Sequence, residues 1–151
     1  MRLRAYGIAS PIAGCAASGN LLAFVLIAPP SLGWQILPDG TRQFHLSDRS
    51  QEGVRKLGAQ IHEFVTEVMI DTVVFSRTST GYGEVGLASE SKIETLLQLI
   101  PGLTTTVIDS HEIAQWVLEN DPPIPANIAS VPRGLAGARA LEIAQYCVLQ
   151  F

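Results

Sequence analysis

The run Leu21–Ala28 constrains the fold more than any other part of the sequence. It is continuously apolar, it includes Phe, Val and Ile, and Pro29-Pro30 stop it. A half-buried strand alternates apolar and polar residues, whereas a strand buried on both faces is apolar throughout. The run therefore predicts a strand inside a sheet that is covered on both faces, as in α/β proteins.

Further strands are indicated on both sides of this run. Leu3–Ala9 alternates loosely and ends in a Ser-Pro break, which predicts a first strand. Pro11–Gly19 is rich in Gly, Ala and Ser, and we interpret it as a turn. A third extended segment covers Trp34–Leu37 and Arg42–Leu46, interrupted by a turn at Pro38-Asp39-Gly40.

The rest of the chain alternates helices and strands. The clearest helix follows Ser47 or Ser50, which can cap it, and one apolar face is formed by Val54, Leu57, Ile61, Phe64 and Val68. After it we predict a strand at Thr72–Phe75, a polar loop at Ser76–Gly86, a helix from Ser89 or Ser91 to Pro101-Gly102, a strand at Thr104–Ile108, a helix at His111–Glu119, a loop at Asp121–Pro132 and a last helix at Leu135–Leu149.

This order of elements predicts an α/β protein with an RNase H-like fold. We expect a mixed five-stranded sheet, in which a three-strand antiparallel meander is followed by two parallel strands, with helices on both faces. Residues 1–151 are expected to form a single domain of this kind. A generic βαβ sandwich is the alternative.

Composition bounds the partners and the location. Apolar residues make up 47% of the chain, and the last helix is apolar almost all round, so we expect a homodimer or higher homo-oligomer. The net charge of −4 and the scattered basic residues give no support to nucleic-acid binding, although a local basic groove stays possible. Leu21–Pro29 is too short to cross a bilayer. We expect a cytoplasmic protein without membrane contact.

The two cysteines, Cys15 and Cys147, are interpreted as buried thiols, because no metal-binding spacing surrounds them. A bacterial lipoprotein cleavage box at Ile12-Ala13-Gly14-Cys15 is the alternative for the N-terminal region, but the apolar stretch before it is weak.

Several segments resemble a known family. They are Met1-Arg2 through Gly7-Ile8, Phe44-His45-Leu46, Asp71-Thr72-Val73-Val74, Thr80-Gly81, Val85-Gly86 and Leu96-Leu97-Gln98-Leu99-Ile100. The chain is similar to a family of short, uncharacterised bacterial proteins of the RNase H-like superfamily, distantly related to Holliday-junction resolvases. This resemblance implies phosphodiester hydrolysis by two metal ions, which three or four carboxylates hold.

The carboxylates implied by the resemblance are missing. The superfamily places one acid near the end of strand one, one at the end of strand four, and one or two on the last helix. At these places we find Ser10, then Phe75-Ser76-Arg77, and only Glu142. A guanidinium at the end of strand four would repel a divalent cation. We therefore expect no two-metal catalysis, no metal ion and no cofactor.

Two segments could still hold a ligand. The loop Ser76–Gly86 could bind an anion through its backbone amides and Arg77, although a flexible glycine loop is the simpler interpretation. Asp109-Ser110-His111-Glu112 reads either as a helix N-cap or as a ligand site at the sheet edge. The candidate ligand-binding residues are Ser10, Ser76, Arg77, Thr78, Thr80, Gly81, Gly83, Asp109 and His111.

Three hypotheses follow for the function. The first is a non-catalytic RNase H-like module that acts by binding or assembly, which would be no enzyme. The second is a small-molecule or anion-binding protein or enzyme that uses the Ser76–Gly86 loop. The third is a metal-dependent nuclease with displaced carboxylates, for which Glu84, Asp109, Glu112 and Glu142 are the candidates; Glu142 is more simply a solvated residue beside Arg139.

Overall fold

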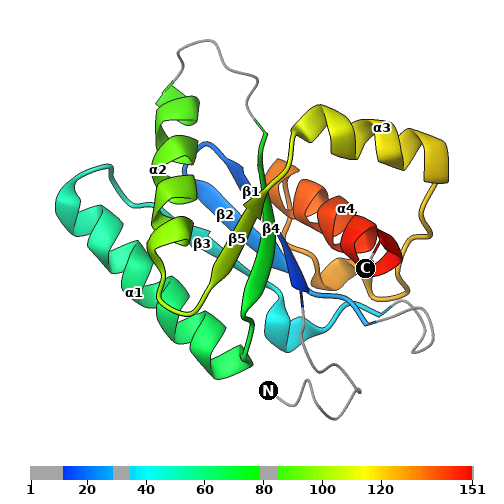
Figure 1. Ribbon diagram of the computed structural model, residues 1–151, viewed down its shortest axis with the longest axis horizontal. Helices are drawn as coiled ribbons and strands as arrows, with labels where there is room; N and C mark the ends of the chain where they lie inside the picture. The colour runs from blue at the N-terminus through cyan, green and yellow to red at the C-terminus, as the bar shows by residue number, and fades with distance from the viewer. Residues whose placement is uncertain (1–11, 29–34, 79–84, 151) are drawn as a thin grey trace.

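The computed structural model describes residues 12–28, 35–78 and 85–150. In these residues a five-stranded sheet has the order β3-β2-β1-β4-β5 (Figure 1). Its strands are β1 (Ile12–Ser18), β2 (Leu21–Val25), β3 (Arg42–His45), β4 (Thr72–Arg77) and β5 (Thr104–Val107). The helices are α1 (Gln51–Val68), α2 (Val85–Leu99), α3 (Ser110–Asn120) and α4 (Leu135–Gln150), with 3-10 turns η3 (Pro38–Gly40) and η4 (Ile128–Ser130).

Strand pairing confirms the predicted RNase H-like plan. β1, β2 and β3 form an antiparallel meander, and β4 and β5 add to β1 as parallel strands. The carboxyl ends of β1, β4 and β5 consequently meet at one edge of the sheet.

The first strand lies further along the chain than the sequence pattern predicts. The predicted turn at Pro11–Gly19 is wrong, because β1 occupies Ile12–Ser18; the predicted strand Leu3–Ala9 lies outside the described residues. β1 is the central strand and is buried on both faces. A β-carbon at Gly14 would overlap the backbone of α4 at Ala140 and Ala144. Small residues are therefore required here by close helix packing, and their resemblance to turn composition misled the prediction.

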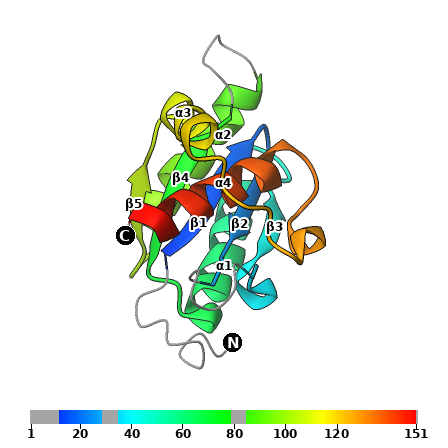
Figure 2. The ribbon, with the colours of Figure 1, turned by 90° about the vertical axis from the view of Figure 1, so that its right-hand side faces the viewer.

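Helices cover both faces of the sheet. α1 and α2 pack on one face, and α3 and α4 on the other, as the two views show (Figures 1 and 2). Residues of β1 and β4 alternate between the two cores: Cys15 and Phe75 belong to the α1/α2 side, whereas Ala16 and Val74 belong to the α4 side. This alternation decides which candidate side chains can share a site.

The predicted N-cap is confirmed for α1 and wrong for α2. α1 begins after Ser50, whose hydroxyl accepts a hydrogen bond from the Gly53 amide at 3.2 Å, so this N-cap is confirmed. α2 begins at Val85, before the predicted cap at Ser89 or Ser91. Ser89 is buried inside the helix, and Ser91 accepts a hydrogen bond from Arg77. These serines serve tertiary contacts, which a local capping rule does not detect.

The segment 121–132 is fixed over α4 by side-chain amides. Asn127 pairs with both backbone groups of Ile36, at 2.9 and 2.8 Å. Gln145 of α4, which is buried, donates to the carbonyl of Pro123 at 2.6 Å. α4 thus lies between the sheet and its own chain, which accounts for much of its apolar character.

Both cysteine thiols, Cys15 and Cys147, are buried and free, as predicted. No helix in the described ranges is long and apolar enough to span a membrane.

Candidate functional site

The edge where β1, β4 and β5 end is the place where α/β proteins hold ligands. The register pairs Ala16 of β1 with Ser76 of β4, and Phe75 with Val107 of β5. The first turn of α3 follows directly from β5, and α4 begins beside it (Figure 1). The ends of these strands and the first turns of α3 and α4 therefore form the candidate site.

Ser76 and Arg77 point to opposite faces of the sheet. Because Val74 belongs to the α4-side core and Phe75 to the α2-side core, strand alternation directs Ser76 toward α4 and Arg77 toward α2. Ser76 is 1% exposed, and its hydroxyl donates to the carbonyl of Arg77 at 3.2 Å. Ser76 therefore occupies the end of β4 on the α4 face.

Arg77 is held by α2. Its Nε lies 3.1 Å from Glu94 Oε1, and its Nη1 donates to Ser91 Oγ at 3.1 Å. We predicted that this guanidinium would lie where the superfamily binds metal ions. That prediction is wrong for the α4 face of the sheet, because neighbouring residues of a strand point to opposite faces and Arg77 points to α2.

A buried carboxylate that the sequence analysis missed lies beside these residues. Glu90 of α2 is fully buried. Its Oε2 accepts a hydrogen bond from the Gly19 amide at 3.0 Å, and its Oε1 accepts one from the Thr78 amide at 2.9 Å. Glu90 thus ties the β1–β2 turn to the end of β4. Its signal in the sequence is a carboxylate on the same helical stripe as Ile93 and Leu97.

Asp109 and His111 form the N-cap of α3. Oδ1 of Asp109 accepts a hydrogen bond from the His111 amide at 2.7 Å, and the His111 side chain is exposed. The capping interpretation of this segment is confirmed. Asp109 lies at the sheet edge where a ligand site was predicted, but its carboxylate accepts a hydrogen bond from the backbone of α3.

Arg139 is the residue that links α4 to this edge. Its Nη1 lies 3.5 Å from Glu142 Oε1 and 3.5 Å from the carbonyl of Ser110. The guanidinium therefore lies between Glu142 and the residue next to Asp109. Burial raises the pKa of the Glu142 carboxyl, and the neighbouring Arg139 charge opposes that rise. Glu142 pairs with Arg139 as predicted, but the pair is partly buried.

The donor set on the α4 face does not fit two divalent cations, which would need three or four carboxylates around them. Here β1 presents Gly14 and Ala16, β4 presents Ser76, and α4 presents one carboxylate, Glu142, beside a guanidinium. Within the residues that the structure describes, no three His, Cys, Asp or Glu side chains gather in a way that could hold a metal ion.

The candidate ligand-binding residues are only partly placed. Ser10, Thr80, Gly81 and Gly83 lie outside the described residues. β1 covers Ile12–Ser18, so its carboxyl end is formed by Ala17-Ser18. Ser76, Arg77 and Thr78 are neighbours in sequence, but the side chains of Ser76 and Arg77 lie on opposite faces of the sheet.

Solved structures of resolvases share this fold. T. thermophilus RuvC in complex with a Holliday junction substrate gives a TM-score of 0.69 at 14% identity, over 93% of this chain and 94% of that chain. A second Thermus thermophilus RuvC structure gives 0.60 at 15% identity, over 89% and 91%. The yeast mitochondrial Holliday junction resolvase Ydc2 gives 0.61 at 6% identity, over 92% and 76%. The protein is therefore an α/β protein with a RuvC-like fold.

A family model assigns the chain to a family by its sequence. The family model described as "Protein of unknown function (DUF3010)" matches residues 11–132, and the protein belongs to this family. This agrees with the predicted resemblance to a resolvase-like family of unknown function. No curated protein matches the chain.

Proposed function

We propose that this protein is a non-cleaving module that has the RuvC-like fold and acts by binding, not by two-metal hydrolysis. The observation that carries the proposal is the position of Arg139, whose guanidinium contacts both Glu142 and the first residue of α3. A fixed positive charge at that point opposes the approach of a divalent cation. Ala16 and Ser76 add no carboxylate opposite it.

Branched DNA is the ligand class to test first, because the solved neighbours include a resolvase bound to a Holliday junction. The net charge of −4 gives no long-range attraction to phosphates. We therefore expect binding that depends on a few local contacts and weakens steeply as salt rises.

The two alternatives have weaker support. For the anion-binding loop, Arg77 is already neutralised by Glu94, so the amides would have to supply the affinity. For a nuclease with displaced carboxylates, Asp109 caps α3 and Glu142 pairs with Arg139, so both acids would have to leave these partners.

We also propose that the protein is a homo-oligomer in the cytoplasm. The support for the homo-oligomer is not α4, which other parts of the chain cover, but the large apolar side chains exposed on the surface. These include Leu99 (73% exposed), Leu118 (80%) and Ile124 (79%). Light scattering after size exclusion tests it: a strict monomer at micromolar concentration would remove this part.

The test of the binding function uses a labelled four-way junction, a duplex of the same arms and a single strand. Each is mixed with the full chain in Mg²⁺, in Mn²⁺ and in EDTA, with anisotropy and gel analysis of the same samples. We expect preferential junction binding in all three buffers, because it does not require a divalent cation, and intact strands. Cleavage that requires the metal would overturn the non-cleaving claim, and absence of binding to every DNA would overturn the DNA ligand.

A further inference from the structure

β3 is an edge strand of the described sheet. Among the described residues it pairs with β2 and with no other strand, so its outer backbone groups have no partner strand there. The amide of Leu46 donates to the carbonyl of Asn20 at 2.8 Å, which fixes the alternation of this antiparallel pair. The peptide groups of Phe44 and Arg42 therefore point to β2, whereas those of Gln43 and His45 point away from it.

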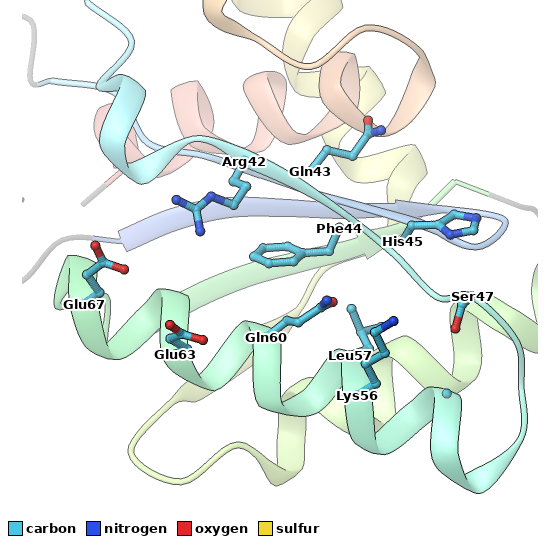
Figure 3. A pocket seen from close by; sticks show the side chains of 11 residues that line it. Arg42, Gln43, Phe44, His45, Ser47, Lys56, Leu57, Gln60, Glu63 and Glu67 are labelled. Atoms are coloured by element: carbon cyan, nitrogen blue, oxygen red, sulfur yellow. The ribbon is translucent and has the colours of Figure 1, made fainter.

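A groove of about 490 Å³ follows this edge, between β3 and α1 (Figure 3). Along its helical side lie Lys56, Gln60, Glu63 and Glu67, spaced so that they form one stripe of α1. Figure 3 shows Phe44 pointing into the groove from β3, above Gln60. The groove is thus bounded by a strand edge and a polar helix face.

Phe44, which lines the groove, belongs to a cluster of three aromatic rings. The rings of Phe24, Phe44 and Phe64 pack against one another with centroids 5.2 to 5.7 Å apart. The guanidinium of Arg42 lies over the Phe64 ring, 4.8 Å from its centroid. A ligand would meet a preformed surface, which lowers the entropic cost of binding.

Charge is distributed unequally along the groove. Lys56 lies at the end where His45 and Ser47 are found. At the other end the two carboxylates of Glu63 and Glu67 outnumber the guanidinium of Arg42, so this end is net negative (Figure 3). In the described part of the chain, ion pairs join only Arg77 to Glu94 and Arg139 to Glu142. Lys56, Glu63 and Glu67 thus have no ion-pair partner among the described residues.

We propose that this groove binds an extended peptide segment of a partner protein, which adds to β3 as an antiparallel strand. Residues opposite His45 and Gln43 would exchange backbone hydrogen bonds with them. The alternate residues would face α1: an acidic one near Lys56, an apolar one over Phe44 and a basic one near Glu63 and Glu67. The ligand class is therefore a segment that reads acidic-x-apolar-x-basic from its N-terminus.

A single strand fits this groove better than a second copy of the protein. α1 already lines the space beside β3, from Gly53 to Glu67. A symmetric pairing of two β3 strands would bring two α1 helices into the same layer. The site also lies on the α1 side of the sheet and is independent of the proposed DNA-binding function.

The test uses the peptide Thr-Asp-Thr-Val-Thr-Lys-Thr, blocked at both ends, and a control peptide with Asp and Lys exchanged. Binding to the full chain is followed by amide chemical shifts in NMR titrations. The matched peptide is expected to shift the amides of Gln43 and His45 and to bind about tenfold more tightly than the control, a difference of about 1.4 kcal/mol.

A charge-exchanged variant, Lys56→Glu with Glu63→Lys, keeps the net charge and should reverse the preference between the two peptides. A backbone control completes the design. N-methylation of either Thr that flanks Val should abolish binding, because those amides face β3, whereas N-methylation of Val should leave it intact.

Each other outcome overturns the proposal. It fails if neither peptide shifts the β3 amides at about 1 mM, a weak-binding limit, or if the exchanged variant keeps the original preference. It also fails if dilution alone moves the Gln43 and His45 amides, since a second copy would then occupy the edge.

Discussion

Gly14 of β1 lies directly against the backbone of Ala140 in α4, so close that a β-carbon on Gly14 would overlap the Ala140 carbonyl oxygen. Strand and helix approach each other here without intervening side chains. This contact leaves no space for a side chain at Gly14 on the α4 face of the central strand.

Gly14→Ala should destabilise the fold by about 3 kcal/mol, because two backbones would have to separate in a packed core. Urea unfolding measures the change. Gly58→Ala in α1 is the matched control, since its new methyl group would meet only the flexible side chain of Leu96, 3.0 Å away, and Ala favours the helix. Equal stability changes in both variants would contradict the close packing of β1 and α4.

Glu90→Ala should cost about 2–4 kcal/mol, because it removes the acceptor of the Gly19 and Thr78 amides. Glu90→Gln, which keeps one oxygen acceptor, should cost less. The amide of Gly19 should exchange with solvent faster in both variants. Glu112→Ala on the exposed side of α3 should change stability by less than about 0.5 kcal/mol. Unchanged exchange at Gly19 would show that Glu90 does not hold this turn.

Arg139→Gln should raise the pKa of Glu142 further, since the positive charge that opposes the effect of burial is removed. When the pKa of a carboxyl is higher in the folded than in the unfolded protein, the free energy of unfolding falls as the pH rises through the folded pKa. The variant should therefore be more destabilised relative to wild type at pH 7 than at pH 4. Carbon NMR titration of the Glu142 carboxyl measures the pKa, with Arg133→Gln at an exposed position as control. A lowered pKa would contradict the assignment.

Stability should fall above pH 9 because of the buried thiols. Burial raises the pKa of Cys147 from its usual 9.0 to about 12, so the unfolded chain releases this proton first. Between these values the free energy of unfolding should decrease by about 1.4 kcal/mol per pH unit for this thiol. Cys147→Ala should lessen the slope by that amount. An identical slope in wild type and variant would show that the thiol ionises in the folded protein.

The sequence predicts elements well where local patterns decide the structure. The apolar stripe of α1 with its cap at Ser50 and the N-cap Asp109 follow from periodicity and capping. The plan of the sheet follows from the order of the elements along the chain. β1 cannot be located in this way, because its small residues are required by close packing against α4, which is distant in sequence.

The candidate site was harder to predict for the same reason. A sequence pattern does not say which face of β4 a residue takes, so it cannot show that Arg77 contacts α2 and lies away from the α4 face. Glu90 was missed because a buried carboxylate is recognised by the amides around it, and these come from two other elements.

The most direct test of the non-cleaving function is a titration of the full chain with Mn²⁺, followed by the electron paramagnetic resonance signal of the free ion. We expect no stoichiometric binding in wild type, since Arg139 lies beside Glu142 and Ala16 and Ser76 offer no carboxylate opposite it. Two ions bound per chain, lost in an Asp109→Asn and Glu142→Gln double variant, would contradict it and would establish a displaced two-metal centre.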